Sequence, residues 1–243
     1  MDRLKDKVAI ITGGAAGMGE AHVRLFVKEG AKVVLTDINS ESGQTLAEEL
    51  GKKAHFIQHD VTNEAGWAKV VSETEEKFGP IDILVNNAGI SPVLTVENSS
   101  LDDYMNVVNI NQVSVFLGMK YVIPSMKKAG HGSIVNISSI NGLSGGVVGY
   151  TDTKFAVRGM TKAAAKELAP YNIRVNSVHP GVINTPMVQE SAAFEQIQAM
   201  VEMIPMKRMS QPNEISQLVL FLASDDSSYS TGTEFIADGG ITA

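Results

Sequence analysis

The sequence predicts an α/β fold in which a central parallel sheet of about seven strands is covered by helices on both faces. One observation predicts this fold, and a second predicts that it forms one domain. Short runs rich in valine and isoleucine alternate with longer helix-like stretches along the chain, and this alternation is typical of βαβ units. No proline- or serine-rich linker and no block of like charge divides the chain, so residues 1–243 are expected to form a single domain.

The elements follow from these runs in order. The expected strands are KVAIIT (7–12), KVVLTD (32–37), AHFIQ (54–58), DILVN (82–86), SIVNIS (133–138), NIRVNSV (172–178) and EFIAD (234–238). Helices are expected at 19–30, 40–50, 63–79, in a long stretch after 86, at 148–169 and at 213–223. The helical period is clearest in 63–79, where Trp67 shares one face with Val70, Val71, Thr74 and Phe78. Trp67 is therefore expected in the core.

Composition narrows the function classes. The chain has no cysteine, which excludes disulfides and thiolate zinc sites and fits a reducing compartment. Its five histidines show no metal-ligand spacing, so no metal is expected in the chemistry. A net charge of -7 disfavours nucleic acid as a partner. No apolar run approaches the ~18 residues that span a bilayer, so we expect a cytoplasmic protein without a membrane partner.

A glycine-rich loop, TGGAAGMG at 12–19, follows the first expected strand and opens a helix. Gly13 permits a tight turn, Gly17 allows the backbone to approach a pyrophosphate, and Gly19 lets the helix pack on the strand. The alternative is a tight turn with a helix cap. Asp37 ends the next strand, 18 residues after Gly19, near the spacing of a carboxylate that binds a ribose hydroxyl. This context favours a Rossmann-like dinucleotide site.

Tyr150 and Lys154 lie four residues apart in GYTDTK, at 149–154. On a helix, this spacing places both side chains on one face, with Cβ atoms roughly 5 to 6 Å apart. An ammonium ~4 Å away stabilises the phenolate by up to about 4 kcal/mol at an effective dielectric of ~20, before the cost of desolvation is subtracted. We therefore expect Lys154 to lower the pKa of Tyr150 by roughly one to three pH units from its ordinary value of about 10. The spacing alone also occurs often by chance.

Further motifs complete a pattern: Asp60 with Val61, NNAG at 86–89, Asn111, Ser139 and HPG at 179–181. With the glycine loop and the Tyr150 motif, they make the chain resemble a short-chain dehydrogenase/reductase over essentially its full length. The stretches VFLGMK, GSIVNISS and RVNSVHPG are also similar to bacterial hydroxysteroid and secondary-alcohol dehydrogenases of that family.

The resemblance implies an oxidoreductase that interconverts a secondary alcohol and its ketone by hydride transfer. In such a site Tyr150 exchanges a proton with the substrate oxygen and Ser139 hydrogen-bonds that oxygen. Lys154 contacts the nicotinamide ribose, and Asn111 holds a water that links Lys154 to solvent. The expected catalytic residues are thus Asn111, Ser139, Tyr150 and Lys154.

We expect NAD(H) as the cofactor, because Asp37 would repel a 2′-phosphate and the glycine loop has no basic residue. By resemblance, Asp60 and Val61 flank the adenine, residues 87–89 line the ribose side, and residues 180–185 cover the nicotinamide end. The expected cofactor-binding residues are Gly13, Ala16, Gly17, Met18, Asp37, Ile38, Asp60, Val61, Asn87, Ala88, Gly89, Tyr150, Lys154, Pro180, Gly181, Ile183 and Thr185.

Residues 184–212 interrupt the alternation with a methionine-rich insertion, which we expect to cover the substrate. Flexible apolar side chains such as Met187, Met203, Met206 and Met209 suit an oily ketone, although methionines at helical spacing also fill cores. Asp152 stands where the family has alanine or serine. It is expected to face away from Tyr150, toward solvent or a subunit interface.

Two other functions remain open. The first is a 3-oxoacyl thioester reductase, which Lys207 and Arg208 would suit but Asp37 disfavours. The second is a non-catalytic NAD-binding regulator, which would have no use for the complete catalytic set. Steroid, cyclic diketone and acetoin-like substrates all remain open. The habit of the family and long helices with apolar positions favour a homodimer or homotetramer.

Overall fold

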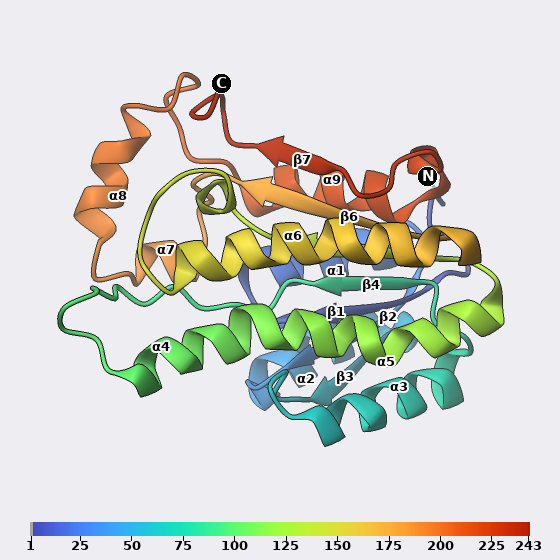
Figure 1. Cartoon of the computed structure of the whole chain (residues 1–243). Helices are drawn as coiled ribbons and strands as arrows, with labels where there is room; N and C mark the ends of the chain where they lie inside the picture. The colour runs from blue at the N-terminus through green and yellow to red at the C-terminus, as the bar shows by residue number, and fades with distance from the viewer. Residues whose placement is uncertain (1) are drawn as a thin grey trace.

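A single seven-stranded sheet organises the chain in the computed structural model, which describes residues 2–243 (Figure 1). All neighbouring strands are parallel, in the order β3-β2-β1-β4-β5-β6-β7. The strands are β1 (Val8–Thr12), β2 (Lys32–Asp37), β3 (Ala54–Gln58), β4 (Ile83–Asn86), β5 (Gly132–Ile137), β6 (Ile173–Pro180) and β7 (Glu234–Ala237). The predicted α/β fold with its parallel sheet is confirmed.

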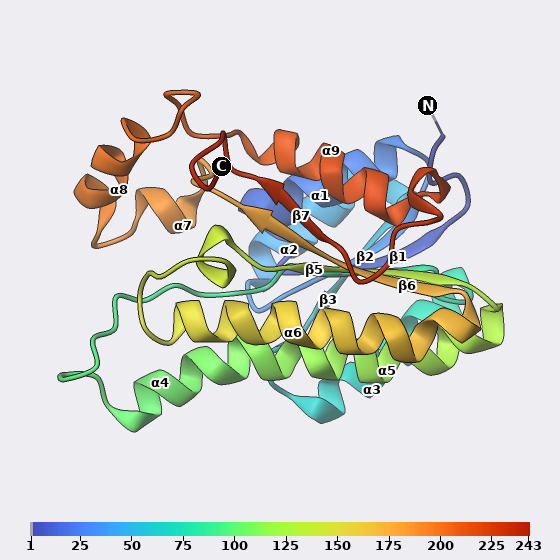
Figure 2. The same cartoon turned by 45° about the horizontal axis from the view of Figure 1, so that its top comes forward.

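Helices cover both faces of the sheet, with α1, α2 and α9 on one side and α3, α5 and α6 on the other (Figure 2). The helices are α1 (Gly17–Lys28), α2 (Ser40–Leu50), α3 (Glu64–Phe78), α4 (Leu101–Val108), α5 (Ser114–Ala129), α6 (Tyr150–Leu168), α7 (Pro186–Gln189), α8 (Phe194–Val201) and α9 (Pro212–Ala223). Within residues 2–243, none of them is both long enough and apolar enough to span a bilayer.

Strand β1 shows why the sheet is covered on both faces. All five residues of VAIIT are buried, and successive side chains point to opposite faces. Ala9 and Ile11 accordingly pack with the helices of one side, whereas Ile10 packs with those of the other. Trp67 of α3 is 0% exposed in the second of these clusters, as predicted. Its indole N–H donates to the carbonyl of Val61 at 2.9 Å, which fixes the loop after β3.

The order of the strands reverses between β1 and β4. From β1 the chain moves outward through β2 to β3, and it then returns to β4 and moves outward in the other direction to β7. The loops that leave β1 and β4 therefore diverge to opposite faces and open a crevice at the carboxyl edge of the sheet. Ligands of open α/β folds bind at this position.

The insertion at 184–212 contains α7 and α8, which project beyond the carboxyl edge of the sheet in the same region as the C-terminus (Figures 1 and 2). Met187, Met203 and Met206 are 48%, 72% and 59% exposed. The interpretation that they fill the core is therefore wrong for these three residues.

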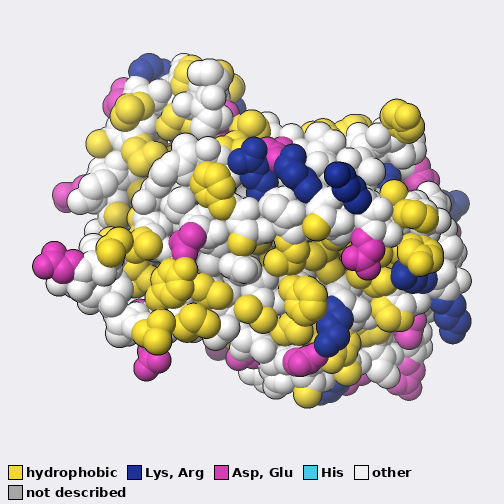
Figure 3. Space-filling model, in the orientation of Figure 1, with side chains coloured by type: hydrophobic (Ala, Val, Ile, Leu, Met, Phe, Trp, Pro, Cys, Tyr) yellow, Lys and Arg dark blue, Asp and Glu magenta, His cyan; other side chains and the backbone are white. Residues whose placement is uncertain are grey.

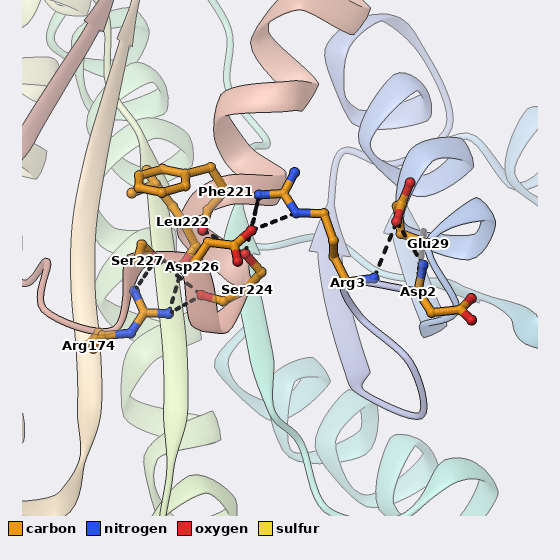
Figure 4. A network of polar contacts seen from close by, with 9 residues as sticks. All are labelled: Asp2, Arg3, Glu29, Arg174, Phe221, Leu222, Ser224, Asp226 and Ser227. Atoms are coloured by element: carbon orange, nitrogen blue, oxygen red, sulfur yellow. Dashed lines mark hydrogen bonds and ion pairs between the residues drawn. The ribbon is translucent and has the colours of Figure 1, made fainter.

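At the amino edge of the sheet, polar contacts tie the N-terminal segment to the end of α9 (Figure 4). Arg3 Nε donates to Asp226 Oδ2 at 2.7 Å. Arg174 of β6 donates to the carbonyls of Leu222 and Ser224 at 2.9 and 3.0 Å. A guanidinium at the last carbonyls of a helix is favourable because those carbonyls lack partners within the helix. This network stabilises the edge opposite the crevice.

Candidate active site

A cavity of about 290 Å³ opens at the crevice between the loops that follow β1 and β4. The lining residues come from four strand ends, from the start of α7 and from the segment between α4 and α5. They are Gly13, Ala16, Gly17, Met18, Asp37, Ile38, His59, Asp60, Val61, Asn87, Ala88, Gly89, Ile90, Ile110, Thr185, Pro186 and Met187. The structure thus gathers most of the expected cofactor-binding residues in one place.

The glycine loop adopts the conformation that its sequence predicts. Gly13 has φ +62°, a conformation that residues with a Cβ rarely adopt, and a Cβ on Gly19 would lie 1.9 Å from the carbonyl oxygen of Gly13. Helix α1 can therefore begin close to β1. Its N-terminus has no side-chain cap, so backbone N–H groups at the cavity are available to an anion.

Asp37 lies at the end of β2 with a half-buried side chain. Oδ2 accepts from the backbone N–H of Ala15 at 3.1 Å, and Oδ1 accepts from that of Asn39 at 3.0 Å. Each carboxylate oxygen keeps a further lone pair. These contacts aim the carboxylate into the cavity, where no lysine or arginine joins the lining formed by residues 2–243.

Asn87 links the loop after β4 to β1. Its amide Nδ2 donates to the carbonyls of Thr12 and Gly13 at 2.9 and 3.2 Å, so the amide orientation is fixed. The other end of the amide, Oδ1, is buried without a partner among residues 2–243. A buried acceptor with no donor is unfavourable. A hydroxyl donor from a ligand in the cavity, such as the ribose of a dinucleotide, fits this position.

Three of the four expected catalytic residues meet where β5 ends and α6 begins. Ser139 follows β5, Tyr150 is the first residue of α6, and Lys154 lies one turn later. The Ser139 side chain lies close enough to the Tyr150 phenol to lower its pKa, and the Lys154 ammonium lies 5.4 Å from the centroid of the Tyr150 ring. A Cβ on Gly89 would lie 3.6 Å from Lys154 Nζ. The group therefore adjoins the cavity at Gly89.

The predicted lowering of the Tyr150 pKa is wrong for the chain on its own. Burial raises the pKa of Tyr150, and the nearby Ser139 side chain opposes this only in part. Burial also lowers the pKa of Lys154 to about 8, and its ammonium donates to the carbonyl of Ile137 at 2.9 Å. The physical reason is that burial disfavours the phenolate and the ammonium together.

Asn111 joins the same group from a π-helical segment, Asn109–Val113, between α4 and α5. It is 0% exposed. Its side chain accepts from the N–H of Ile90 and donates to the carbonyl of Ile90, both at 2.8 Å, and it donates to Thr153 Oγ1 at 3.4 Å. The Asn111 amide therefore fastens the loop after β4 to the segment that carries Lys154. π-Helical segments are frequent at functional sites.

Three residues expected at the nicotinamide end do not line the cavity. Pro180 ends β6, Gly181 donates its N–H to Ala237 at 3.0 Å, and Ile183 is buried in the core at 4% exposure. Pro186, which the sequence did not indicate, and Met187, which was expected to cover the substrate, line the cavity in their place. The proline after Thr185 was the available signal, since proline favours the first turn of a helix.

His59, Ile90 and Ile110 also line the cavity and were missed. Each is a neighbour of an expected residue or segment, so only the turn of the backbone decides its position.

Asp152, expected at solvent or a subunit interface, is half-buried and accepts from the hydroxyl of Tyr104 on α4 at 2.5 Å. The part of the chain from 2 to 243 contains no cluster of three His, Cys, Asp or Glu residues suited to a metal.

Known proteins resemble this chain over its whole length. A family model described as enoyl-(acyl carrier protein) reductase matches residues 13–242. A 3-alpha-(or 20-beta)-hydroxysteroid dehydrogenase from Mycobacterium bovis is 49% identical, with 99% of this chain and 91% of the relative covered. A crystal structure of a short-chain type dehydrogenase/reductase from Mycobacterium marinum has a TM-score of 0.94 at 35% identity and covers 99% of this chain and 97% of that chain. The chain belongs to the short-chain dehydrogenase/reductase family.

Two further relatives of this dehydrogenase/reductase are named for a different substrate or cofactor. A cyclopentanol dehydrogenase from Comamonas sp. is 48% identical over 100% of both chains. An NADP-dependent (R)-specific alcohol dehydrogenase from Lentilactobacillus kefiri is 43% identical, with 100% of this chain and 99% of the relative covered. Membership in the family establishes an oxidoreductase that uses a nicotinamide cofactor. The choice between NAD and NADP varies among such relatives, so it has to be argued from the residues of this chain.

Proposed function

We propose that this protein interconverts a secondary alcohol and its ketone with NAD(H), using Tyr150 as the acid and base. The observation that carries the proposal is the meeting of Ser139, Tyr150 and Lys154 beside Gly89, at the edge of a cavity that also contains the Asp37 carboxylate. Hydroxysteroid, cyclopentanol and other alcohol dehydrogenases among the relatives support the same reaction class.

The cavity supports NAD(H) over NADP(H) through its charge. Asp37 would repel a 2′-phosphate and accept a hydrogen bond from a free 2′-hydroxyl. Within residues 2–243, the lining provides no cation to neutralise such a phosphate. Asn87 Oδ1 and the uncapped N-terminus of α1 offer an acceptor for a ribose hydroxyl and donors for a pyrophosphate.

When bound, the cofactor supplies or accepts the hydride. In the reduction, the Tyr150 hydroxyl donates its proton to the carbonyl oxygen, while the Ser139 hydroxyl donates a hydrogen bond to the same oxygen. Burial keeps Tyr150 protonated at neutral pH, so the phenol is ready to act as the acid. In the oxidation, Tyr150 must first lose this proton, and the ammonium of Lys154 stabilises the phenolate that remains.

The insertion at 184–212 supports an apolar substrate. Met187 lines the cavity, and Met203 and Met206 of the same insertion are exposed rather than packed in the core. Flexible apolar side chains at this position suit closure over a ketone. We propose that residues 184–212 cover the substrate as part of one domain, 1–243.

A thioester reductase is not favoured by the basic pair in the insertion. Arg208 is bound by both oxygens of Glu214 at 2.7 and 2.8 Å, and Lys207 is bound by the carbonyl of Glu202. Both side chains are exposed and already have partners of their own, so they do not form an unpaired basic site for an acyl-carrier phosphate.

We also propose that the protein forms a homodimer or homotetramer. Hydrophobic side chains gather on the face formed by α4, α5 and α6 (Figure 3). Met105, Phe116 and Phe155 on these three helices are 39%, 51% and 40% exposed, and exposed apolar patches of this kind mark interaction sites. In sedimentation velocity, Phe116→Lys should shift the protein toward the monomer. A monomeric unsubstituted protein would contradict this part of the proposal.

The experiment that tests the function compares NADH and NADPH oxidation by the purified protein. The ketone panel contains a steroid, a cyclic diketone, diacetyl and an acetoacetyl thioester. Turnover of NADH with one of the ketones is expected. Turnover with NADPH and the thioester alone would overturn the proposal, and NADH binding without turnover of any ketone would favour a regulator.

A further inference from the structure

A fully buried histidine holds the main chain of Ser139. His179 lies near the end of β6 and is 0% exposed. Its Nδ1 is 3.0 Å from the carbonyl oxygen of Ser139, and its Nε2 is 2.9 Å from Ser177 Oγ. His179 belongs to the HPG motif at 179–181 and does not line the cavity.

The partners of the ring decide which nitrogen carries the proton. A carbonyl oxygen can only accept, so Nδ1 must be the donor to Ser139. In the neutral ring Nε2 then accepts from the hydroxyl of Ser177, which fixes the tautomer. Burial lowers the pKa of His179 and so maintains the neutral ring. The contact to Ser139 is thus a defined donor on a buried strand.

Ser139 needs such a contact because it lies just outside the sheet. The last backbone bond between β5 and β6 in this region joins Ser138 N to the carbonyl of Val178 at 2.8 Å. The carbonyl of Ser139 also accepts from Gly142 N at 2.9 Å, and its hydroxyl oxygen accepts from Asn141 N at 3.1 Å. Both of these donors belong to the same loop and move with it, whereas His179 belongs to the sheet.

We propose that His179 is a positioning residue that fixes the main chain of Ser139, so that the Ser139 hydroxyl is aimed at the substrate oxygen. The inference rests on the proposed function, in which Ser139 contacts the substrate. A displacement of about 1 Å at a reacting group is enough to lower a rate by as much as ~100-fold.

Two substitutions separate the two ends of the ring. In His179→Asn, the amide nitrogen takes the place of Nδ1 and can still donate to Ser139. In His179→Gln, the amide takes the place of Nε2 and reaches Ser177 instead. We expect His179→Gln to lower kcat about tenfold or more, with NADH affinity unchanged, and His179→Asn to remain within about threefold of the unsubstituted enzyme. The matched control is His55→Gln, which makes the same histidine-to-glutamine change at a half-buried position of β3.

The decisive measurement repeats His179→Gln in a Ser139→Ala background. If His179 acts through the Ser139 hydroxyl, the second substitution should cause almost no further loss of kcat. Equal losses in both backgrounds, or equal losses for His179→Asn and His179→Gln, would overturn the proposal and indicate a general structural role. Full activity in Ser139→Ala alone would instead contradict the proposed function, in which Ser139 contacts the substrate. Failure of the His179 proposal and failure of the proposed function therefore give different results.

Discussion

Replacing Asp37 with asparagine would remove a negative charge from the cavity with little change in side-chain size. The Asp37 carboxylate accepts from the N–H groups of Ala15 and Asn39 at 3.1 and 3.0 Å. Asparagine has one carbonyl oxygen and retains one of these bonds. The substitution therefore tests the charge while it preserves part of the loop geometry.

The expected size of the effect follows from Coulomb's law. Two unit charges ~4 Å apart repel by about 1 kcal/mol in water and about 4 kcal/mol at an effective dielectric of ~20. Because Asp37 is half-buried, about 2 to 3 kcal/mol is appropriate for the repulsion of a 2′-phosphate. Asp37→Asn should thus improve kcat/KM for NADPH roughly 30- to 150-fold. Loss of the charged acceptor for the 2′-hydroxyl should weaken NADH by roughly tenfold.

The assay measures kcat/KM for both cofactors with one ketone at two salt concentrations. The gain with NADPH should be smaller at high salt, because salt screens the repulsion in the unsubstituted enzyme. Glu41→Gln, on the exposed first turn of α2, removes the same charge away from the cavity and serves as the control. A ratio of NADPH to NADH activity that changes less than about threefold in a folded Asp37→Asn protein would refute the reasoning.

Tyr150→Phe should lower kcat by roughly 100- to 10,000-fold and leave NADH binding, measured by fluorescence, intact; unchanged turnover would exclude the proton-transfer role. Because burial raises the pKa of Tyr150, alcohol oxidation should increase toward alkaline pH while ketone reduction persists at neutral pH, and a flat pH profile for oxidation would contradict this. Burial lowers the pKa of Lys154 from 10.5 to about 8, so the folded chain binds this proton less tightly than the unfolded chain. Lys154→Met should then raise the free energy of unfolding at neutral pH by up to about 3 kcal/mol while abolishing turnover, and a lower Tm would contradict the argument. Burial lowers the pKa of His22 from 6.5 to about 3. As the pH falls between these two pKa values, His22 binds a proton in the unfolded chain but not in the folded chain. The free energy of unfolding therefore falls by about 1.4 kcal/mol per pH unit. His22→Asn can still donate to Ser216, the 2.7 Å partner of Nδ1, and should lose less Tm between about pH 7 and about pH 4.5; an equal loss would show that other groups control acid stability.

The fold could be predicted because its signals are local. A strand such as VAIIT, buried on both faces, is a continuous apolar run in the sequence, and α3 repeats its apolar residues with the helical period. The glycine loop was predictable for the same reason, since the positive φ of Gly13 and the close approach at Gly19 are requirements on single residues.

The exact lining of the cavity was less predictable, because it depends on how separate segments meet. The expected segment at 180–185 has Ile183 turned into the core, while Met187 of the next turn faces the cavity. A shift of one or two residues along the turning backbone decides which of these side chains faces the cavity. The spacing of Tyr150 and Lys154 predicts one face of a helix, as α6 has it. It could not give the sign of the Tyr150 pKa shift, because that depends on burial by the rest of the chain.

The sequence by itself determined the strands, most of the helices that cover the sheet, the glycine loop and the set of residue types able to transfer a proton. It did not indicate α7 and α8 within the insertion. Only the tertiary structure decided that Asn87 Oδ1 is buried without a partner within residues 2–243, that Arg208 is occupied by Glu214, and that His179 holds Ser139. The physical reason is that backbone conformation and periodicity are properties of neighbouring residues. Burial and hydrogen-bond partnership arise between residues that are far apart in the chain, and they exist only once the sheet has brought those residues together.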